Sequence, residues 1–194
     1  MKKYYDFKDG LNEADFFYSY SPHAPIRAKF KQENGCLINA YSDEVKNFEY
    51  ASVVTRKKYG VGVKLTTECD FDSFGAPLVV LSDDIKMDEN GVGTYGLHFE
   101  VVAWEKGCNV WHITPVYYEK ENLPVTPIKI GCKAFSIADK SKIRMSVEVI
   151  EHGLKIDVNG ETFTVCHPDI PETFHIGITA CEGINRFYNL LIED

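Results

Sequence analysis

The sequence lacks the apolar periodicity of helices and has no long hydrophobic run. Along its 194 residues, apolar side chains alternate with polar ones far more often than they recur every three or four positions. No run approaches the roughly 20 apolar residues of a membrane helix. The first residues, MKKYYDFKD, carry charges where a secretory signal has its apolar stretch. We therefore expect a mainly β protein that is located in the cytoplasm.

The sequence also lacks any cluster of basic residues. It has 21 Lys and Arg against 29 Asp and Glu, a net charge of −8. Binding to nucleic acid needs a basic stripe that neutralises phosphates, and an anionic membrane surface has the same requirement. We therefore expect no nucleic-acid partner and no membrane partner. No linker, repeat or low-complexity tract divides the chain, which predicts a single domain over residues 1–194.

Metal-binding motifs are missing as well. None of the six cysteines forms a Cys-x-x-Cys pair, and no two of the six histidines have His-x-x-x-His spacing. The sequence therefore predicts no zinc site and no cofactor. The cysteines are expected to be reduced, small buried hydrophobic residues. The acidic segment with Asp83, Asp84, Asp88 and Glu89 fits a solvated hairpin loop, with Ca²⁺ binding as the alternative, although EF-hand spacing is not met.

Turn signals and strand-like runs are what the sequence has instead. Asn34-Gly35, Asn90-Gly91 and Asn159-Gly160 are typical of tight hairpin turns, because Asn and Gly tolerate a positive φ. Residues 11–20 are expected to hold one helical turn, and residues 119–128 form the longest predicted loop. Strands are predicted at 3–7, 26–31, 36–41, 48–56, 61–70, 76–82, 95–105, 108–114, 128–135, 142–150, 153–158, 161–166, 173–181 and 186–193. Many short strands with frequent turns indicate a β-sandwich or a barrel.

Two predicted strands show clearly which face is buried. Along 142–150, the apolar residues Ile143, Met145, Val147 and Val149 alternate with polar ones. Along 95–105, one face holds Leu97, Phe99, Val101 and Ala103, and the other holds His98, Glu100, Val102 and Trp104. Such strands are typical of a sandwich with one face of a sheet on the core and the other toward solvent.

The order of elements resembles a known superfamily. The chain turns into GCLIN at 35–39 and ends with LKIDVNG at 154–160, TFHIGIT at 173–179 and RFYNLLI at 186–192. These segments resemble the concanavalin A-like lectin/glucanase superfamily over nearly the whole chain. The resemblance implies an all-β fold, a two-sheet antiparallel jelly-roll β-sandwich. It also implies carbohydrate as the ligand, bound on the concave sheet.

The same resemblance suggests a catalytic pair. Laminarinase-like members carry Glu-x-Asp-x-x-Glu on a bulged strand; Glu100 and Glu105 match the two Glu positions, and Val102 replaces the Asp. The match implies Glu100 as nucleophile and Glu105 as acid/base. In a regular strand their odd separation sends them to opposite faces, and only a bulge would reunite them. Because Val102 departs from the pattern, we expect sugar binding without turnover. In the alternative, Glu105 only begins the hairpin turn.

The two tryptophans, Trp104 and Trp111, flank one hairpin. A turn centred on Lys106-Gly107 predicts that Trp104 faces Asn109 across the hairpin and that Val102 faces Trp111. Both rings then share one face with Glu100. They either form an apolar platform for a sugar or cap the edge of the core.

These residues define the predicted function and its competitor. The predicted substrate-binding set is His98, Trp104, Trp111, Arg144, Glu148 and His175. The function is a carbohydrate-binding or carbohydrate-processing protein, a glycoside hydrolase if it is an enzyme. The alternative is a non-catalytic interaction or structural β-sandwich whose concave face packs another subunit. Solvent exposure of the two tryptophans discriminates between these functions.

Overall fold

Strands form almost all of the regular structure, as the alternating sequence predicts. The computed structural model describes residues 1–24, 26–39 and 49–194. Within these ranges the only helices are the short 3-10 turns η1 (Phe7–Asp9) and η2 (Glu119–Glu121). The helical turn expected in 11–20 is instead largely strand β2 (Phe16–Tyr20). The outer ends of two predicted strands, at 40–41 and 48, lie outside the described residues.

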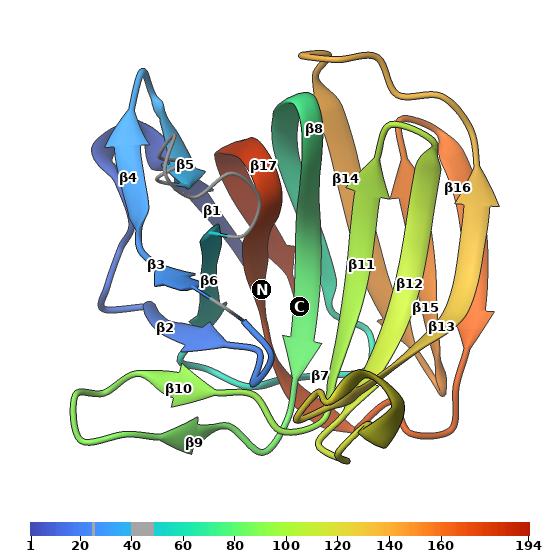
Figure 1. Cartoon of the computed structure of the whole chain (residues 1–194). Coiled ribbons are helices and arrows are strands. Elements are labelled where there is room, and N and C mark those ends of the chain that lie inside the picture. The colour runs from blue at the N-terminus through green and yellow to red at the C-terminus, as the bar shows by residue number, and fades with distance from the viewer. Residues whose placement is uncertain (25, 40–48) are drawn as a thin grey trace.

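Hydrogen bonds join the strands into one network, which β8 and β17 divide into two packed layers, called here the first and second sheet (Figure 1). Register defines the first sheet as β13 (Thr126–Ala134), β12 (Gly107–Thr114), β11 (His98–Trp104), the end of β8 (Lys64–Ser82), the start of β17 (Thr173–Glu193), β6 (Glu49–Thr55), and β2 with β3 (Ile26–Ala28). The second sheet is β16 (Glu161–Cys166), β15 (Gly153–Val158), β14 (Ile143–Ile150), the start of β8, the end of β17, β1 (Lys2–Asp6), and β5 (Cys36–Asn39) with β4 (Phe30–Glu33). Three two-residue strands, β7 (Tyr59–Gly60), β9 (Lys86–Met87) and β10 (Gly93–Thr94), complete the fold.

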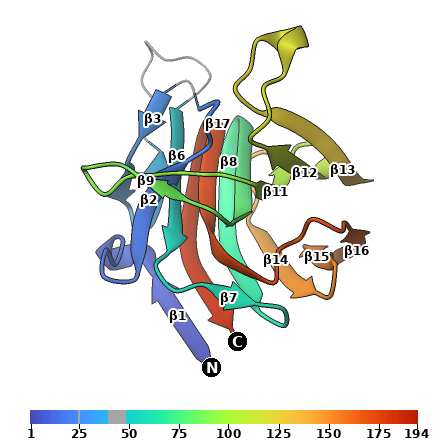
Figure 2. The same ribbon diagram turned by 90° about the horizontal axis from the view of Figure 1, so that it is seen from below.

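Two long strands pass through both sheets. β8 and β17 pair antiparallel from Lys64 opposite Glu193 to Ser82 opposite His175, and they run side by side through the molecule (Figure 1). The sequence predicted each as two strands. Bulges interrupt the pairing around Gly183, where the chain leaves one sheet for the other without a turn. Figure 2 shows β1 beside the end of β17, with the two termini close together.

The core lies between the sheets and follows the predicted faces. Phe99, Val101 and Ala103 of β11 are fully buried there, together with the alternating apolar residues of β14. The opposite face of the first sheet carries a smaller apolar cluster of Phe17, Val54, Leu78, Val80 and Tyr95. The predicted core faces of β11 and β14 are confirmed, but the other face of β11 is only partly open to solvent, because His98 and Glu100 are buried on it.

The cysteines divide between interior and surface. Cys36, Cys69 and Cys108 are buried, as predicted, but Cys132 and Cys166 are exposed. The prediction is wrong for these two because their strands, β13 and β16, turn those side chains outward. None of the helices among the described residues is long and apolar enough to span a membrane.

Candidate functional site

A cavity of about 310 Å³ lies on the face of the first sheet that points away from the core. The two tryptophans, Trp104 and Trp111, line it from β11 and β12. Its polar lining consists of His23, Glu100, Asn109 and Glu182. The structure therefore brings three of the predicted residues together in one cavity, Glu100 and both tryptophans.

The hairpin that carries the tryptophans is two residues out of the predicted register. Trp104 pairs with Gly107, so Glu105 and Lys106 form the turn; Val102 pairs with Asn109. Trp111 pairs with Glu100. Gly107 takes a φ of +134°, and a Cβ there would meet the Lys133 carbonyl oxygen at 2.1 Å. A shift of two residues keeps each side chain on the same face of the sheet. The prediction that Trp104 and Trp111 share a face with Glu100 is therefore correct although the predicted register is not.

Both tryptophan rings are partly open to solvent rather than packed into the core. Each is half-buried, and each has a lysine beside it. Lys106 Nζ lies 5.6 Å from the Trp104 ring centroid, and Lys129 Nζ lies 5.9 Å from that of Trp111. Partly exposed aromatic rings beside polar groups form an apolar surface that a ligand can cover.

Glu100 is held by two buried neighbours at the bottom of the cavity. It is 7% exposed, and its Oε1 accepts a hydrogen bond of 2.7 Å from the Tyr50 hydroxyl. His98 Nε2 lies 3.5 Å from the same oxygen. Burial by itself would raise the pKa of Glu100, but the adjacent His98 imidazole, the hydrogen bond from Tyr50 and the nearby His23 hold that pKa below its ordinary value. Glu100 is therefore a preorganised carboxylate.

His98 supports the site but does not line it. Its side chain is completely buried, its ring lies tilted against that of Tyr95 with centroids 5.0 Å apart, and its Nδ1 is 3.1 Å from the Gly96 carbonyl oxygen. The sequence placed His98 among the substrate-binding residues because it shares the face of Glu100. The structure shows that Tyr95 and its neighbours cover it, so His98 contacts Glu100 rather than the open cavity.

Glu182 is the second carboxylate of the cavity. It sits at the bulge of β17 with a φ of +58°, and its half-burial raises the pKa of the carboxyl group. Arg186 lies only four residues further along β17 but does not join Glu182 at the cavity. The bulge separates them, because Arg186 points from the second-sheet half of β17 and binds Asp70 and Asp72 at 3.0 and 2.8 Å.

Glu105 lies outside the cavity lining. It is exposed in the hairpin turn, where its Oε1 lies 3.4 Å from Lys106 Nζ. No register shift occurs between β11 and β12 to reunite it with Glu100, because the pairing is continuous from His98 to Trp104. The structure thus gives the predicted Glu100/Glu105 pair no shared cleft.

Three other predicted residues are distributed elsewhere. Arg144 and Glu148 line a separate cleft of about 240 Å³, because β14 pairs with the second-sheet half of β8. This corrects their predicted placement on the cavity face. His175 lies on the first sheet, but its Nδ1 is 2.7 Å from the Thr55 carbonyl oxygen and its ring packs edge-on against Phe17.

Sequence reasoning missed His23, Tyr50 and Cys181 as parts of this site. His23 lies edge-on to Tyr50 at 6.4 Å, and Cys181 lines the cavity beside Glu182. No spacing pattern links these positions, which come from three separate segments of the chain.

The acidic segment is organised by its own hydrogen bonds. Asp88 Oδ1 accepts bonds of 2.9 Å from the amides of Asn90 and Val92, and Asp83 pairs with Lys58 at 2.5 Å. These contacts fit the predicted hairpin loop. Calcium binding by this segment stays a hypothesis.

Comparison with known proteins identifies the fold. No family model matches the sequence, and a search of curated proteins finds no relative. Among solved structures, the laminarinase catalytic domain of Thermotoga petrophila RKU-1 gives a TM-score of 0.61 at 13% identity, over 99% of this chain and 96% of that one. The carbohydrate-binding module CBM66 of Bacillus subtilis gives 0.60 at 8%, over 92% and 99%. The β-glucanase of Bacillus licheniformis gives 0.59 at 11%, over 100% and 98%.

These likenesses define the class of protein. The chain is an all-β jelly-roll β-sandwich with the concanavalin A-like lectin/glucanase fold, as its sequence order predicted. At 8–13% identity they establish the fold and not the activity.

Proposed function

We propose that the cavity between Trp104, Trp111, Glu100 and Glu182 binds carbohydrate. The observation that carries this proposal is the combination of two partly exposed indole rings with two carboxylates and the Asn109 amide in one cavity. An indole face packs against the C–H side of a sugar, and carboxylate and amide groups bond its hydroxyls. The three structural neighbours named above are carbohydrate-binding or glucan-hydrolysing proteins, which supports the same ligand class.

The lining also argues against a subunit-packing face. The central part of a protein interface is depleted of charged residues. This cavity instead holds two carboxylates, Glu100, which is already buried, and Glu182, which is half-buried and would lose its contact with solvent under a second subunit. A hydroxyl-rich ligand supplies the hydrogen bonds they need. A cytoplasmic location and the lack of nucleic-acid and membrane partners remain predictions from composition.

A titration with β-glucan oligosaccharides tests this proposal. Binding should change the tryptophan fluorescence, because both indoles would be covered. Trp104→Ala and Trp111→Ala should each weaken binding by about 1–3 kcal/mol, the value of one large apolar contact. Calorimetry provides the affinities.

Tyr4→Ala serves as the matched control. Tyr4 is 60% exposed on β1 of the second sheet, so its loss removes an aromatic ring far from the cavity. Its affinity should equal that of the wild type. If both tryptophan variants fold and bind oligosaccharide as the wild type does, the cavity is not the carbohydrate site.

Hydrolysis is the second candidate function, and one observation favours it. Glu100 and Glu182 line the same cavity while their environments move their pKa values in opposite directions, Glu100 down and Glu182 up. Glycosidases use such a pair, an ionised carboxylate and a protonated acid. In this role Glu182 replaces Glu105 as the proton donor, and Glu100 keeps the role of ionised partner.

Rates of β-glucan hydrolysis by single variants test this pair. Glu182→Gln should lower the rate by about 10²–10⁴, the usual contribution of a general acid, and Glu100→Gln should lower it at least as much. Glu105→Gln is the control and should leave the rate unchanged. A wild-type protein that binds glucan without hydrolysing it would rule out catalysis and leave the binding proposal intact.

A further inference from the structure

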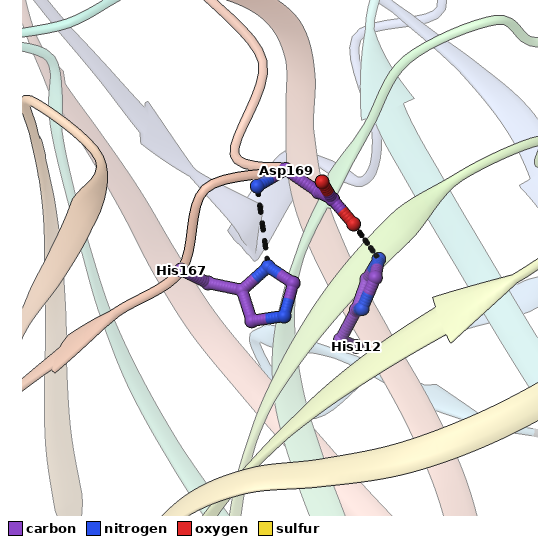
Figure 3. A group of neighbouring side chains, drawn as sticks. All are labelled: His112, His167 and Asp169. Atoms are coloured by element: carbon purple, nitrogen blue, oxygen red, sulfur yellow. Dashed lines mark hydrogen bonds and ion pairs between the residues drawn. The ribbon is translucent and has the colours of Figure 1, made fainter.

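Three potential metal ligands meet at the edge of the sandwich, away from the cavity. His112 projects from β12, and His167 and Asp169 lie in the connection between β16 and β17 (Figure 3). One ligand atom from each residue lies within 4.8 Å of the other two. His112 Nε2 and Asp169 Oδ2 are 3.7 Å apart. The three side chains point toward one another in Figure 3.

His112 is the unusual member of this cluster. It is 3% exposed, and its ring stacks on Phe99 with centroids 4.8 Å apart. Within the described part of the chain, neither of its ring nitrogens forms a hydrogen bond. A buried polar group without a partner is destabilising, so such a group in a native fold calls for an explanation such as an ion.

We propose that His112, His167 and Asp169 bind a divalent transition-metal ion, with Zn²⁺ as the best match. Two imidazole nitrogens and one carboxylate oxygen form a donor set that zinc accepts, with water completing the tetrahedron. The ion would give the buried imidazole of His112 its missing partner.

The surroundings suit loading from solvent. The Asp169 side chain is 53% exposed, so an ion can reach the cluster from outside. Figure 3 shows the carboxylate of Asp169 directed at the His112 ring.

Binding requires one local rearrangement. The Asp169 amide donates a hydrogen bond of 3.2 Å to His167 Nδ1. If Nδ1 ligates the ion, it loses the lone pair that accepts this bond; if Nε2 ligates, the ring proton must move to Nδ1. Either way this bond breaks, at a net cost of about one ordinary hydrogen bond.

The ion would connect the two sheets. His112 belongs to the first sheet, and His167 directly follows β16 of the second. The bound metal would therefore hold the connection 167–172 against β12. Its site lies on the core side of β12, whereas Trp111 faces the cavity, so the metal proposal is independent of carbohydrate binding.

Zinc affinity, measured by competition with a chromogenic chelator, tests the site. The wild type should bind one Zn²⁺ and melt at a higher temperature when it is added, because a ligand that binds only the folded state stabilises it. His167→Ala and Asp169→Asn should each weaken binding at least about tenfold. Both positions are partly exposed, so these variants avoid the packing defect expected of His112→Ala. His152→Ala, a histidine exposed in the β14–β15 turn, is the control and should bind as the wild type does.

Zinc binding by cysteine thiols must be distinguished from binding at this site, because Cys132 and Cys166 are exposed. The titration is therefore repeated in a Cys132→Ser/Cys166→Ser background and with Co²⁺. We expect unchanged affinity in that background and a cobalt spectrum without thiolate charge-transfer bands. Lack of zinc binding by the wild type, loss of binding in the serine background, or unchanged affinity in both His167→Ala and Asp169→Asn would overturn the proposal.

Discussion

At the scale of single residues, two glutamates in one cavity have different environments and therefore pKa values shifted in opposite directions. Glu100 receives a hydrogen bond from Tyr50 and lies beside His98, so its charged form is stabilised. Glu182 sits at a strand bulge, where its half-burial raises the pKa of its carboxyl group and disfavours the charged form. Neighbouring donors, rather than burial alone, decide which carboxylate is ionised.

This contrast predicts opposite effects of pH on two variants. Glu182 has a raised pKa, so at pH values above it the wild type carries a disfavoured charge. Glu182→Gln removes that charge and should raise the melting temperature near about pH 7, with the gain vanishing below the ordinary value of 4.5. Glu100 has a lowered pKa, so its charge stabilises the fold above 4.5. Glu100→Gln should therefore lower the melting temperature near about pH 7, less so at acid pH.

Thermal melts of the wild type and of the variants between about pH 3 and about pH 8 measure both effects. The wild type is the reference at each pH, and Glu105→Gln, whose side chain is exposed, is the control. A melting difference that stays constant with pH for either variant would contradict the assigned environment of that carboxylate.

At the scale of elements, a glycine allows β17 to lie against β6. Gly177 pairs with Val54 in the first sheet, and a Cβ there would lie 1.9 Å from the Val53 carbonyl oxygen and 2.8 Å from Val54 Cα. These are main-chain atoms, which cannot move without displacing the strand. The first sheet therefore needs glycine at this position.

Gly177→Ala should destabilise the protein by at least about 2 kcal/mol, the cost of overpacking a rigid site. Gly60→Ala on β7 is the matched control, because its Cβ would lie 3.3 Å from the Glu172 carbonyl oxygen and needs only a small adjustment. Urea unfolding at equilibrium gives both free energies. Equal stability of the two variants would show that the β6–β17 approach is not as close as described.

At the scale of the whole molecule, the two long strands determine where the functional residues meet. β8 and β17 each contribute one half to each sheet, so a residue's sheet depends on which side of the bulge it occupies. Glu182 therefore lines the cavity, while Arg186, four residues later, binds Asp70 and Asp72 on the second sheet. The cavity thus combines His23, Glu100 and Glu182 from segments far apart in the chain.

The sequence by itself determined the fold class and the buried faces. Alternation with a period of two identifies which side of a strand is apolar, and this is a local property. For that reason the faces of β11 and β14 were predicted correctly, and the cavity face of Glu100, Trp104 and Trp111 survived a register error of two residues. The order of hairpins was sufficient to suggest the jelly roll.

Only the tertiary structure decided which residues share a site. Arg144 and Glu148 alternate as well as Glu100 does, yet they face another cleft, because sheet membership depends on long-range pairing between strands. Sequence spacing could not show whether Glu105 or Glu182 shares the cavity with Glu100. A bulge in β17, rather than one in β11, brings the second carboxylate there. His112 and His167 match no sequence motif. Packing across the edge of the sandwich, and not sequence spacing, brings their ring centroids to 4.4 Å from each other.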